Sequence, residues 1–271
     1  MFKLSDITFS YQDKIGLKKS KYYNKKGETI GIMGPNGCGK STLFKLLTGL
    51  ISPQHGTYEF DNKLISSKSL RNPVISNYLH SHIGYVFQNS ASQLFNESVT
   101  TELAFGPTQM GLSNQEIDIR VQDCLKLLDI EHLANRVPYQ LSGGEQKLVA
   151  IGSILTMNPP VIIMDEPFNG LSPKYQKLVK QLLLKLKAVN KTLIISSHNY
   201  YYINDVIDRC LLFNEQHTLE KDLTPDVIEN NADLKKFIGI LNRTVTTNYK
   251  RYYPKKWIVP LFSILKIISQ K

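Results

Sequence analysis

Short apolar runs alternate with longer amphipathic segments through the middle of this chain. Four runs have the length of a buried strand: residues 29–33 (TIGIM), 83–87 (IGYVF), 161–164 (VIIM) and 192–195 (TLII). Between the last two runs, apolar residues recur at helical spacing, at Leu178, Val179, Leu182, Leu183 and Leu186. Uniformly apolar strands separated by amphipathic helices predict an α/β fold with a mostly parallel core sheet that is covered on both faces.

Other stretches complete the expected architecture. Residues 1–33 and 56–64 contain short strand-like runs and predict a small antiparallel β layer. Residues 64–82 are polar and contain Pro73, which favours a loop. Helical periodicity dominates residues 98–157. One stripe of this helical region is formed by Val121, Cys124, Leu125 and Leu128.

The residues after the first apolar run fit the pattern G-x-x-x-x-G-K-[ST] of a phosphate-binding loop. They are Gly34, Pro35, Asn36, Gly37, Cys38, Gly39, Lys40, Ser41 and Thr42. The glycines allow a tight turn whose N–H groups point at anionic oxygens. Lys40 supplies a charge for the β- and γ-phosphates, and the Ser41 hydroxyl is a candidate Mg²⁺ ligand. A helix is expected from Lys40, and one of its faces would carry Leu43, Leu46, Leu47 and Leu50.

Polar residues follow three other apolar runs, and ligands of open α/β sheets bind at the carboxyl ends of the strands. Asp165 is placed to hold Mg²⁺ through water, and Glu166 is the candidate general base for the attacking water. Gln88 has a long neutral side chain that can reach both metal and water. His198 is placed to contact the γ-phosphate and to sense its presence.

A second motif, Leu141-Ser142-Gly143-Gly144-Glu145, opens another predicted helix. The free N–H groups at the helix start and the Ser142 hydroxyl form a second anion site. This site lies about a hundred residues from the phosphate loop, so it need not serve the same phosphate. In a two-fold pair of chains it would meet the ATP that the partner holds.

Composition limits the compartment and the partners. The net charge of the 271 residues is +10, but nine basic residues and no acidic one follow Asp233, so the rest of the chain is nearly neutral. A body that gripped nucleic acid would carry its own basic excess, which disfavours that class. No run is apolar and long enough for a membrane span, and no signal peptide is visible. These features favour a soluble, cytosolic body.

The cysteines point the same way. Cys38, Cys124 and Cys210 are widely spaced, which argues against a disulfide framework or a zinc site and for a reducing compartment. Cys38 lies near a predicted helix N-terminus, where a thiol pKa is often lowered. We therefore expect a thiol reagent to modify Cys38 and to block ATP binding. The alternative is an inert small residue that fills the loop.

Taken together, these motifs resemble the ATP-binding cassette (ABC) ATPases over roughly residues 2–222. The resemblance implies a P-loop NTPase that hydrolyses ATP to ADP and phosphate with Mg²⁺, as a dimer that closes ATP between two copies. It assigns Tyr11 to stack on adenine, although an ordinary strand aromatic is the other interpretation. The ATPase domain is then expected over residues 1–222, with an inserted helical subdomain at about 89–157.

Two segments resemble more specifically the ATPases of energy-coupling factor (ECF) importers: residues 87–95 (FQNSASQLF) and 99–107 (VTTELAFGP). In that family an extra helix after the glutamine carries Gln-Leu-Phe and helps to dock a transmembrane coupling subunit, while a small membrane protein binds the substrate. The implied function is to power the uptake of a micronutrient, a cobalt or nickel ion or a vitamin, at the cytoplasmic face of the membrane. The competing functions are a soluble cassette ATPase acting on the ribosome or DNA, and a conventional ABC transporter ATPase.

Three features depart from the family pattern. Glu145 stands where glutamine is usual, and Leu148 stands where an arginine usually follows a few residues later. Ser172 stands where an aspartate precedes the proline that opens a helix. Serine should still cap this helix, but the contacts of the aspartate across the dimer would be lost. A homodimer and a heterodimer with a paralogous ATPase both stay open. Residues 223–271 form a basic extension that suits either membrane-surface contact or dimerisation.

Overall fold

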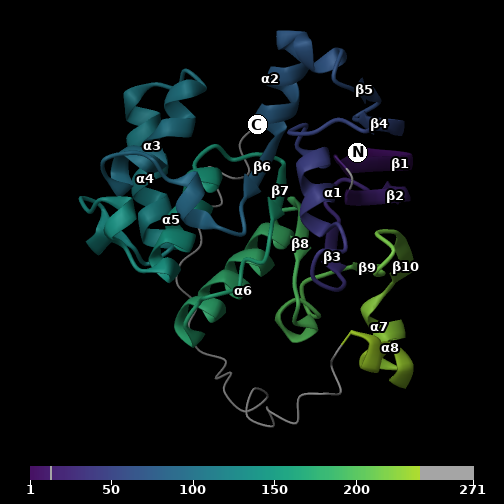
Figure 1. Ribbon diagram of the computed structural model, residues 1–271. Helices are drawn as coiled ribbons and strands as arrows, with labels where there is room; N and C mark the ends of the chain where they lie inside the picture. The colour runs from purple at the N-terminus through teal and green to yellow at the C-terminus, as the bar shows by residue number, and fades with distance from the viewer. Residues whose placement is uncertain (13, 239–271) are drawn as a thin grey trace.

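The larger of two sheets forms the centre of the molecule in the computed structural model, which describes residues 1–12 and 14–238 (Figure 1). Its strands are β3 (Thr29–Met33), β6 (Ile83–Val86), β7 (Val161–Met164), β8 (Thr192–Ser196), β9 (Arg209–Phe213) and β10 (Leu219–Leu223), in the order β10-β9-β3-β8-β7-β6. Every pairing is parallel except that of β9 with β10. The predicted α/β fold with a mostly parallel sheet is therefore confirmed.

The second sheet is antiparallel and lies at the opposite side of the molecule from the helical region (Figure 1). Its strands are β1 (Phe2–Tyr11), β2 (Lys14–Tyr23), β4 (His55–Phe60) and β5 (Lys63–Ile65), in the order β2-β1-β4-β5. This sheet is the predicted antiparallel layer. Helix α1 (Lys40–Leu47) lies between the two sheets, and its Leu43, Phe44, Leu46 and Leu47 are fully buried.

One prediction in this part of the chain is wrong. Residues 64–82 were expected to be mostly loop, but Pro73–His82 form helix α2, preceded by a 3₁₀ turn over Ser69–Arg71. The helix begins well because the Asn72 side chain accepts a hydrogen bond from the N–H of Val74 and Pro73 occupies the first position. Only Leu79 is buried in α2, so the apolar periodicity that marks a helix is missing from the sequence.

The helical region contains α3 (Val99–Gln109), α4 (Asn114–Leu127) and α5 (Gly143–Leu155), with 3₁₀ turns at Ser90–Gln93, Glu131–Leu133 and Pro138–Gln140. These three helices lie together at one side of the molecule (Figure 1). The predicted stripe of α4 is buried in full. The chain then forms α6 (Pro173–Ala188), a 3₁₀ turn at Tyr200–Tyr202, α7 (Pro225–Glu229) and α8 (Ala232–Phe237).

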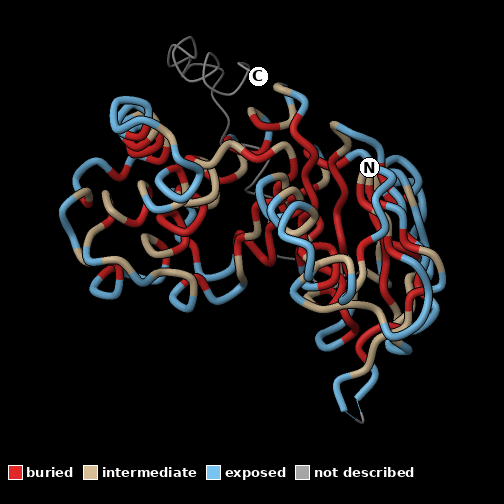
Figure 2. Tube along the Cα trace, turned by 90° about the horizontal axis from the view of Figure 1, so that it is seen from above, coloured by how far each residue is buried: buried red, intermediate tan, exposed pale blue. Residues whose placement is uncertain are grey.

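Side chains of the large sheet alternate between two cores, because successive residues of a strand point to opposite faces. On β7, Val161 and Ile163 pack with α1 and the antiparallel sheet, whereas Ile162 and Met164 pack with α5 and α6. The buried residues in Figure 2 follow the strands and the inward faces of the helices. The carboxyl ends of β3, β6, β7 and β8 thus become a fixed platform between the two cores.

Two smaller expectations fail. Helix α1 ends at Leu47, so Leu50 lies beyond the buried stripe and is 57% exposed. Ser172 occupies the position before α6, but its side chain makes no capping hydrogen bond. Pro173, which has no N–H to satisfy and a φ suited to a helix start, begins α6 without it.

Candidate nucleotide site

The phosphate loop follows β3 and closes against Gly16, near the start of β2. Gly39 has a φ of +112°, and a Cβ there would lie 2.3 Å from the Gly16 carbonyl oxygen. Gly37 also has a positive φ, at +79°. Non-glycine residues rarely adopt these conformations, so the glycines set the path of the loop. Its tip, Pro35-Asn36-Gly37, is exposed, while Cys38, Gly39, Lys40 and Thr42 are buried and Ser41 is half-buried.

The Lys40 side chain folds back across this loop. Its Nζ donates to the carbonyl oxygens of Gly34, at 2.8 Å, and Pro35, at 2.9 Å. The ammonium group is therefore held inside the turn formed by the loop, at the N-terminal end of α1. A positive charge at this position adds to the favourable field of the helix N-terminus for an anionic ligand.

Cys38 does not have the activated thiol that its position suggested. The side chain is 2% exposed, and burial raises the pKa of the thiol although Lys40 lies close by. Desolvation of a thiolate outweighs the attraction of one cation here. The expected lowering of the pKa is wrong, and the structure favours the alternative of an inert residue that fills the loop.

A chain of short hydrogen bonds joins the loop to the carboxyl ends of β7 and β8. The Ser41 hydroxyl donates to Asp165 Oδ2 at 2.6 Å, and the Ser196 hydroxyl donates to Asp165 Oδ1 at 2.6 Å. Tyr85 reaches Oδ2 from β6 at 3.4 Å. Asp165 is 2% exposed, so these hydroxyls stabilise a buried carboxylate. The structure thus brings Ser41 and Asp165 together, as the sequence predicted.

Glu166 points toward His198 from an unusual backbone conformation. Its φ is +50°, which is uncommon for a residue other than glycine and often marks a functional site. The Ser196 hydroxyl accepts from its N–H at 2.8 Å, and Glu166 Oε2 accepts from the N–H of His198 at 3.2 Å. The Nε2 atom of His198 lies 3.0 Å from Glu166 Oε1. The two residues predicted to act at the γ-phosphate are therefore neighbours.

Burial sets the protonation of this pair. Glu166 is 3% exposed, and desolvation raises the pKa of its carboxyl to about 7. The pKa of His198 is lowered, first by burial and then by the charge of Lys40. A carboxyl with a pKa near neutrality is suited to accept a proton at physiological pH.

Gln88 lies just beyond β6, and its side chain is exposed. The residue is held through its backbone carbonyl, which accepts a hydrogen bond. The Lys147 ammonium group, from α5, donates to the Gln88 carbonyl at 2.7 Å and to that of Phe87 at 3.4 Å. Lys147 is 3% exposed, and burial lowers its pKa against the opposing charges of Asp165 and Glu166. Sequence reasoning missed Lys147, because its only signal was a polar residue at a buried position of a helix.

The second motif forms the N-terminus of α5. Ser142 and Glu145 make a reciprocal capping box: the Ser142 hydroxyl accepts from the N–H of Glu145, and Glu145 Oε2 accepts from the N–H of Ser142 at 2.9 Å. The Ser142 hydroxyl also donates to Oε2 at 2.7 Å. Ser142 and Gly143 are exposed, whereas Gly144 is buried against Tyr175. The helix start therefore faces outward, away from the buried core.

Tyr11 ends β1 near the phosphate loop. Its ring is 40% exposed, packs edge-on against Phe9 at 4.8 Å, and lies 5.7 Å from Lys45 Nζ. A Cβ on Gly16 would contact both Tyr11, at 3.3 Å, and Thr42, at 2.9 Å. The partly exposed ring therefore lies near the end of the loop, and its stacking on adenine stays a prediction.

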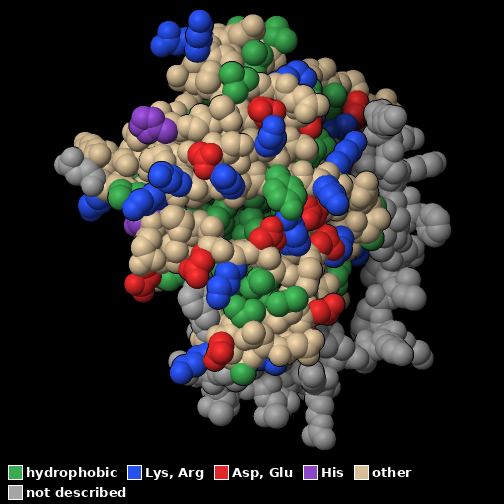
Figure 3. All heavy atoms as spheres, turned by 90° about the vertical axis from the view of Figure 1, so that its right-hand side faces the viewer, with side chains coloured by type: hydrophobic (Ala, Val, Ile, Leu, Met, Phe, Trp, Pro, Cys, Tyr) green, Lys and Arg blue, Asp and Glu red, His purple; other side chains and the backbone are tan. Residues whose placement is uncertain are grey.

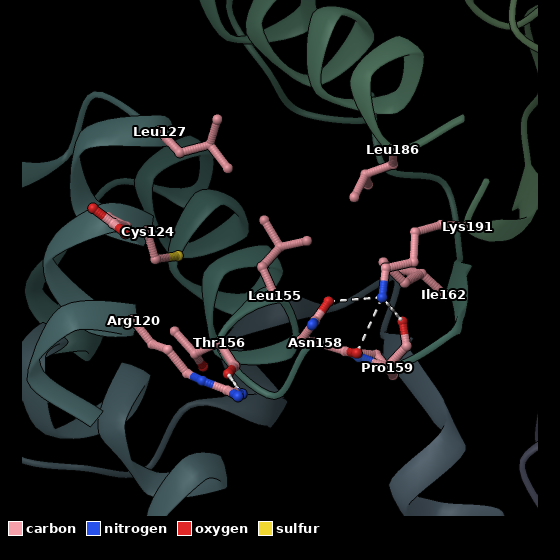
Figure 4. A pocket seen from close by; sticks show the side chains of 11 residues that line it. Arg120, Cys124, Leu127, Leu155, Thr156, Asn158, Pro159, Ile162, Leu186 and Lys191 are labelled. Carbon is pink, nitrogen blue, oxygen red and sulfur yellow. Dashed lines mark hydrogen bonds between the residues drawn. The ribbon is translucent and has the colours of Figure 1, made fainter. Parts of the chain in front are cut away.

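Two cavities flank this region. A cleft of about 550 Å³ lies beside the loop, between Gly34, Pro35 and His198 on one side and Glu215 and Glu220 on the other. A second cavity, of about 40 Å³, lies at the amino ends of β7 and β8, away from the predicted residues (Figure 4). There Lys191 Nζ donates to the carbonyls of Asn158 and Pro159 and to the Asn158 side chain.

A family model described as ABC transporter matches residues 17–169, which include the phosphate loop, the Ser142 motif and Asp165-Glu166. The chain belongs to the ABC transporter family. Because cassettes of this family bind and hydrolyse ATP, this ABC protein is an ATPase. None of its helices within residues 1–12 and 14–238 has the length and apolar character needed to cross a bilayer.

Known proteins place this ABC ATPase more closely. It is 48% identical to the nickel import ATP-binding protein LarO of Lactiplantibacillus plantarum, over 83% of this chain and 93% of that protein. It is 38% identical to the energy-coupling factor transporter ATP-binding protein EcfA of Methanococcus maripaludis, over 84% of this chain and 81% of that protein. These relatives confirm the predicted resemblance to ECF-type ATPases.

A solved structure of a dimeric ATP-binding cassette in a post-hydrolysis state, bound to ADP and Pi, also matches this ABC ATPase. The TM-score is 0.74 at 30% identity, over 83% of this chain and 99% of that one. The likeness supports the P-loop cassette fold that the two sheets and the helical region display.

The oxygen atoms around Asp165 fit a hard divalent cation. Ser41 Oγ, in the first turn of α1, and Asp165 Oδ2, just after the carboxyl end of β7, lie 2.6 Å apart at the end of the phosphate loop. Hydroxyl, carboxylate and phosphate oxygens are the ligands that Mg²⁺ prefers. Within the described residues, no group of three or more histidine, cysteine or acidic side chains forms a metal site of its own. The donor set therefore suits a cation that is shared with a bound nucleotide.

Proposed function

We propose that this chain is the ATP-hydrolysing subunit of an ECF importer, working as one of two cassettes that close around ATP. The observation that carries the proposal is the convergence of the phosphate loop, Asp165 and Glu166 in a single chain whose outward-facing α5 start offers a second anion site. Both halves of a shared ATP site are thus present, so a homodimer is possible, as is a heterodimer with a paralogous cassette.

In the proposed site, Mg²⁺ held by Ser41, Asp165 and the side chain of Gln88 would neutralise charge on the β- and γ-phosphates. The backbone N–H groups of residues 34–42 and the Lys40 ammonium bind and orient the phosphates, and Tyr11 stacks on the adenine. Glu166 accepts the proton of the attacking water, since its carboxyl has a pKa near neutrality and points to the end of the site marked by His198. His198 contacts the γ-phosphate. The Ser142-Gly143-Gly144-Glu145 start of α5 serves the ATP of the partner.

Membrane partners are proposed from the segment after Gln88. The sequence predicted an extra helix carrying Gln-Leu-Phe, but the 3₁₀ turn ends at Gln93, and Leu94 and Phe95 follow it. Phe95 is nonetheless 68% exposed and packs edge-on against Phe105 at 4.9 Å. An exposed aromatic pair of this kind is suited to a protein interface. We propose that it docks a transmembrane coupling subunit, which places the chain at the cytoplasmic face of the membrane.

The transported substrate is proposed as a transition-metal ion, nickel or cobalt, because the relative that shares 48% identity is named for nickel import. The vitamin alternative is tested by the same uptake assay. The domain limits stay predictions, with the cassette at residues 1–222 and the basic extension at 223–271. Residues 239–271 of that extension lie outside the described residues. Its proposed contact with the membrane surface or with a second cassette therefore stays a prediction.

The competing function on the ribosome or DNA has less support. On the face shown in Figure 3, acidic and basic side chains are interspersed over the antiparallel sheet and β10, without a basic stripe. Nucleic-acid-binding surfaces gather Lys and Arg on one face. The near-neutral charge of the chain up to Asp233 points in the same direction.

The function is tested by purifying tagged protein from detergent-solubilised membranes of the native host and identifying what accompanies it. Recovery of a coupling subunit and a small membrane protein, with ATP-dependent ⁶³Ni²⁺ or ⁵⁷Co²⁺ uptake in reconstituted vesicles, is the expected result. If the vesicles take up a vitamin and no metal ion, the substrate is a vitamin. Recovery of ribosomes or DNA-bound proteins would overturn the proposal.

The role of Glu166 has its own test. Glu166→Gln removes the proton acceptor but keeps a side chain of the same shape, so it should bind ATP and remain as a closed dimer. Turnover should fall by about 10² or more. Gel filtration with ATP and a phosphate-release assay measure both effects. An unchanged turnover rate would refute the role of Glu166.

A further inference from the structure

Residues 87–96 link three parts of the molecule. The segment leaves β6 after Val86, carries Gln88, turns through Ser90–Gln93 and ends at Asn96 before the cap of α3. The Gln93 side chain accepts from the N–H of Phe87 at 3.1 Å, which ties the turn to the start of the segment. The segment therefore runs from the nucleotide site to the exposed Phe95 as one closed unit.

A buried cation holds the first end of the segment. Lys147 donates to the carbonyls of Phe87 and Gln88 from the second turn of α5, the helix that Ser142 caps. Because Lys147 is 3% exposed, these carbonyls and the nearby charges of Asp165 and Glu166 replace its water. A movement of α5 that left the segment behind would strip a buried ammonium group of its acceptors.

A buried anion holds the other end. Oε2 of Glu102, on α3, accepts from the N–H of Phe95 at 3.0 Å, the N–H of Asn96 at 2.9 Å and the Asn96 side chain at 3.0 Å. Glu102 is 3% exposed, and within the described part of the chain no Lys or Arg lies within ion-pair distance of it. A buried carboxylate is tolerated when N–H donors satisfy it, so the turn that presents Phe95 cannot shift without stranding a charge.

We propose that Lys147 and Glu102 are positioning residues that make residues 87–96 a rigid link between the start of α5 and the membrane-facing Phe95. Both side chains are 3% exposed, so they act through the backbone that they hold rather than at the surface. Through this link, a displacement of α5 caused by the ATP of the second cassette reaches the docked subunit. The inference rests on the proposed function for the identity of the partner, whereas the link itself is a property of this chain alone.

The first test concerns the link without a partner. In Glu102→Ala the N–H groups of Phe95 and Asn96 lose their acceptor, and their hydrogen exchange should accelerate by about tenfold or more. Glu102→Gln keeps a carbonyl oxygen at the same place and should restore most of the protection. The matched control is Glu97→Ala, an exposed glutamate on the same loop. Equal exchange in Glu102→Ala and Glu97→Ala would overturn the inference.

If Glu102→Ala does not fold, Asn96→Ala replaces it, since this variant removes one of the three donors and leaves the buried carboxylate with two. Exchange at Phe95 should then still rise by a few fold. Exchange that stays at the wild-type rate in a folded Asn96→Ala protein, together with unchanged partner binding, would count against the role of Glu102.

The second test uses the complex, with whichever membrane protein accompanies the wild-type chain as the probe. Glu102→Ala should bind this protein about tenfold more weakly, while ATP hydrolysis by the isolated chain stays within about twofold of wild type. Lys147→Met should keep the binding but lower the uptake per ATP hydrolysed several-fold, and Lys147→Arg should restore it. A general loss of structure would not weaken partner binding in one variant and lower the uptake per ATP hydrolysed in the other.

The outcomes distinguish the two proposals. If the wild-type chain brings down no membrane protein, the proposed function falls and the transmission role falls with it, even where exchange shows the link. If wild type binds its partner and both variants match Glu97→Ala in binding and coupling, the inference alone is overturned.

Discussion

Lys191 is a cation held by carbonyl groups rather than by a carboxylate. Its Nζ bonds to Asn158 and Pro159 at 2.7–3.1 Å, the side chain is 8% exposed, and burial lowers its pKa to about 8. Arg120, whose guanidinium donates to the Thr156 carbonyl on the same cavity, adds to this lowering (Figure 4). Both cations lie near the C-terminal end of α5, where the helix dipole favours positive charge.

This pKa predicts how stability changes with pH. The folded-state pKa of Lys191 lies below its unfolded value of about 10.4, so the unfolded chain binds more protons between these values. The free-energy cost of burying the charged Lys191 ammonium group is complete below pH 8, and it fades as the pH rises and the folded chain releases this proton. Relative to Lys191→Met, wild type should gain on the order of 1–3 kcal/mol of unfolding free energy between pH 7.5 and 10. Urea unfolding at several pH values measures this; parallel profiles would contradict it.

Glu145 places a negative charge at an anion site. Hydrogen bonds from the Ser142 hydroxyl and N–H lower the pKa of its carboxyl, so it is ionised at neutral pH. The charge repels a phosphate approaching the start of α5, with a strength that salt screens.

Glu145→Gln should therefore lower the ATP concentration needed for half-maximal hydrolysis, by about 3–10-fold at low salt. Glutamine can replace glutamate in a capping box, so the thermal unfolding temperature should stay nearly constant. ATPase titrations at low and high salt measure the effect. The same half-maximal concentration in both proteins at low salt would rule out the repulsion.

At the scale of the element, the N-terminus of α5 contains one glycine that packs against α6 and one that is exposed. A Cβ on Gly144 would lie 3.1 Å from the Tyr175 ring, so this glycine lets α5 approach α6. A Cβ on Gly143 would have no neighbour within 4 Å among residues 1–12 and 14–238. The two adjacent glycines therefore serve different purposes.

Gly143→Ala should fold as well as wild type, because alanine favours a helix and meets nothing. If the second cassette's ATP packs here, hydrolysis should nonetheless fall by 10-fold or more, since the added methyl group stands between α5 and the phosphate. Gly144→Ala should instead lower the unfolding temperature by a few degrees. Full activity in Gly143→Ala would exclude a close approach of ATP to this helix start.

The elements differ in how well the sequence predicts them. β3, β7 and β8 were predicted because they are apolar on both faces, and the residues at their ends follow from parallel topology. Helix α2 was missed because it buries one residue, and Ser172 was given a capping bond that Pro173 makes unnecessary. The roles of Lys147, Glu102 and Ser196 were missed as well. Each depends on hydrogen bonds made by one buried polar side chain, and such bonds leave no periodic pattern in the sequence.

For the whole molecule, the division of the core bears on the proposed sharing of ATP between two cassettes. Helix α1 belongs to the core shared with the antiparallel sheet, whereas α5 belongs to the core on the other face of the large sheet. The phosphate loop and the Ser142 motif therefore lie at the N-termini of two helices that pack on opposite faces of the large sheet. A second copy related by a two-fold axis can present its own Ser142 motif to the first copy's loop, and this arrangement repeats at the symmetric site.

Mixing two inactive variants tests this arrangement. Lys40→Ala damages only the loop, and Gly143→Asp damages only the start of α5, so neither homodimer should hydrolyse ATP. In a mixed dimer one site carries both lesions and the other carries none. Because an equal mixture forms about half mixed dimers, each with one of two sites intact, about a quarter of wild-type activity should return. Wild-type chain alone must be active as a control, which also distinguishes a homodimer from an obligate heterodimer. No recovery in the presence of active wild type would mean that each chain hydrolyses ATP with its own Ser142 motif.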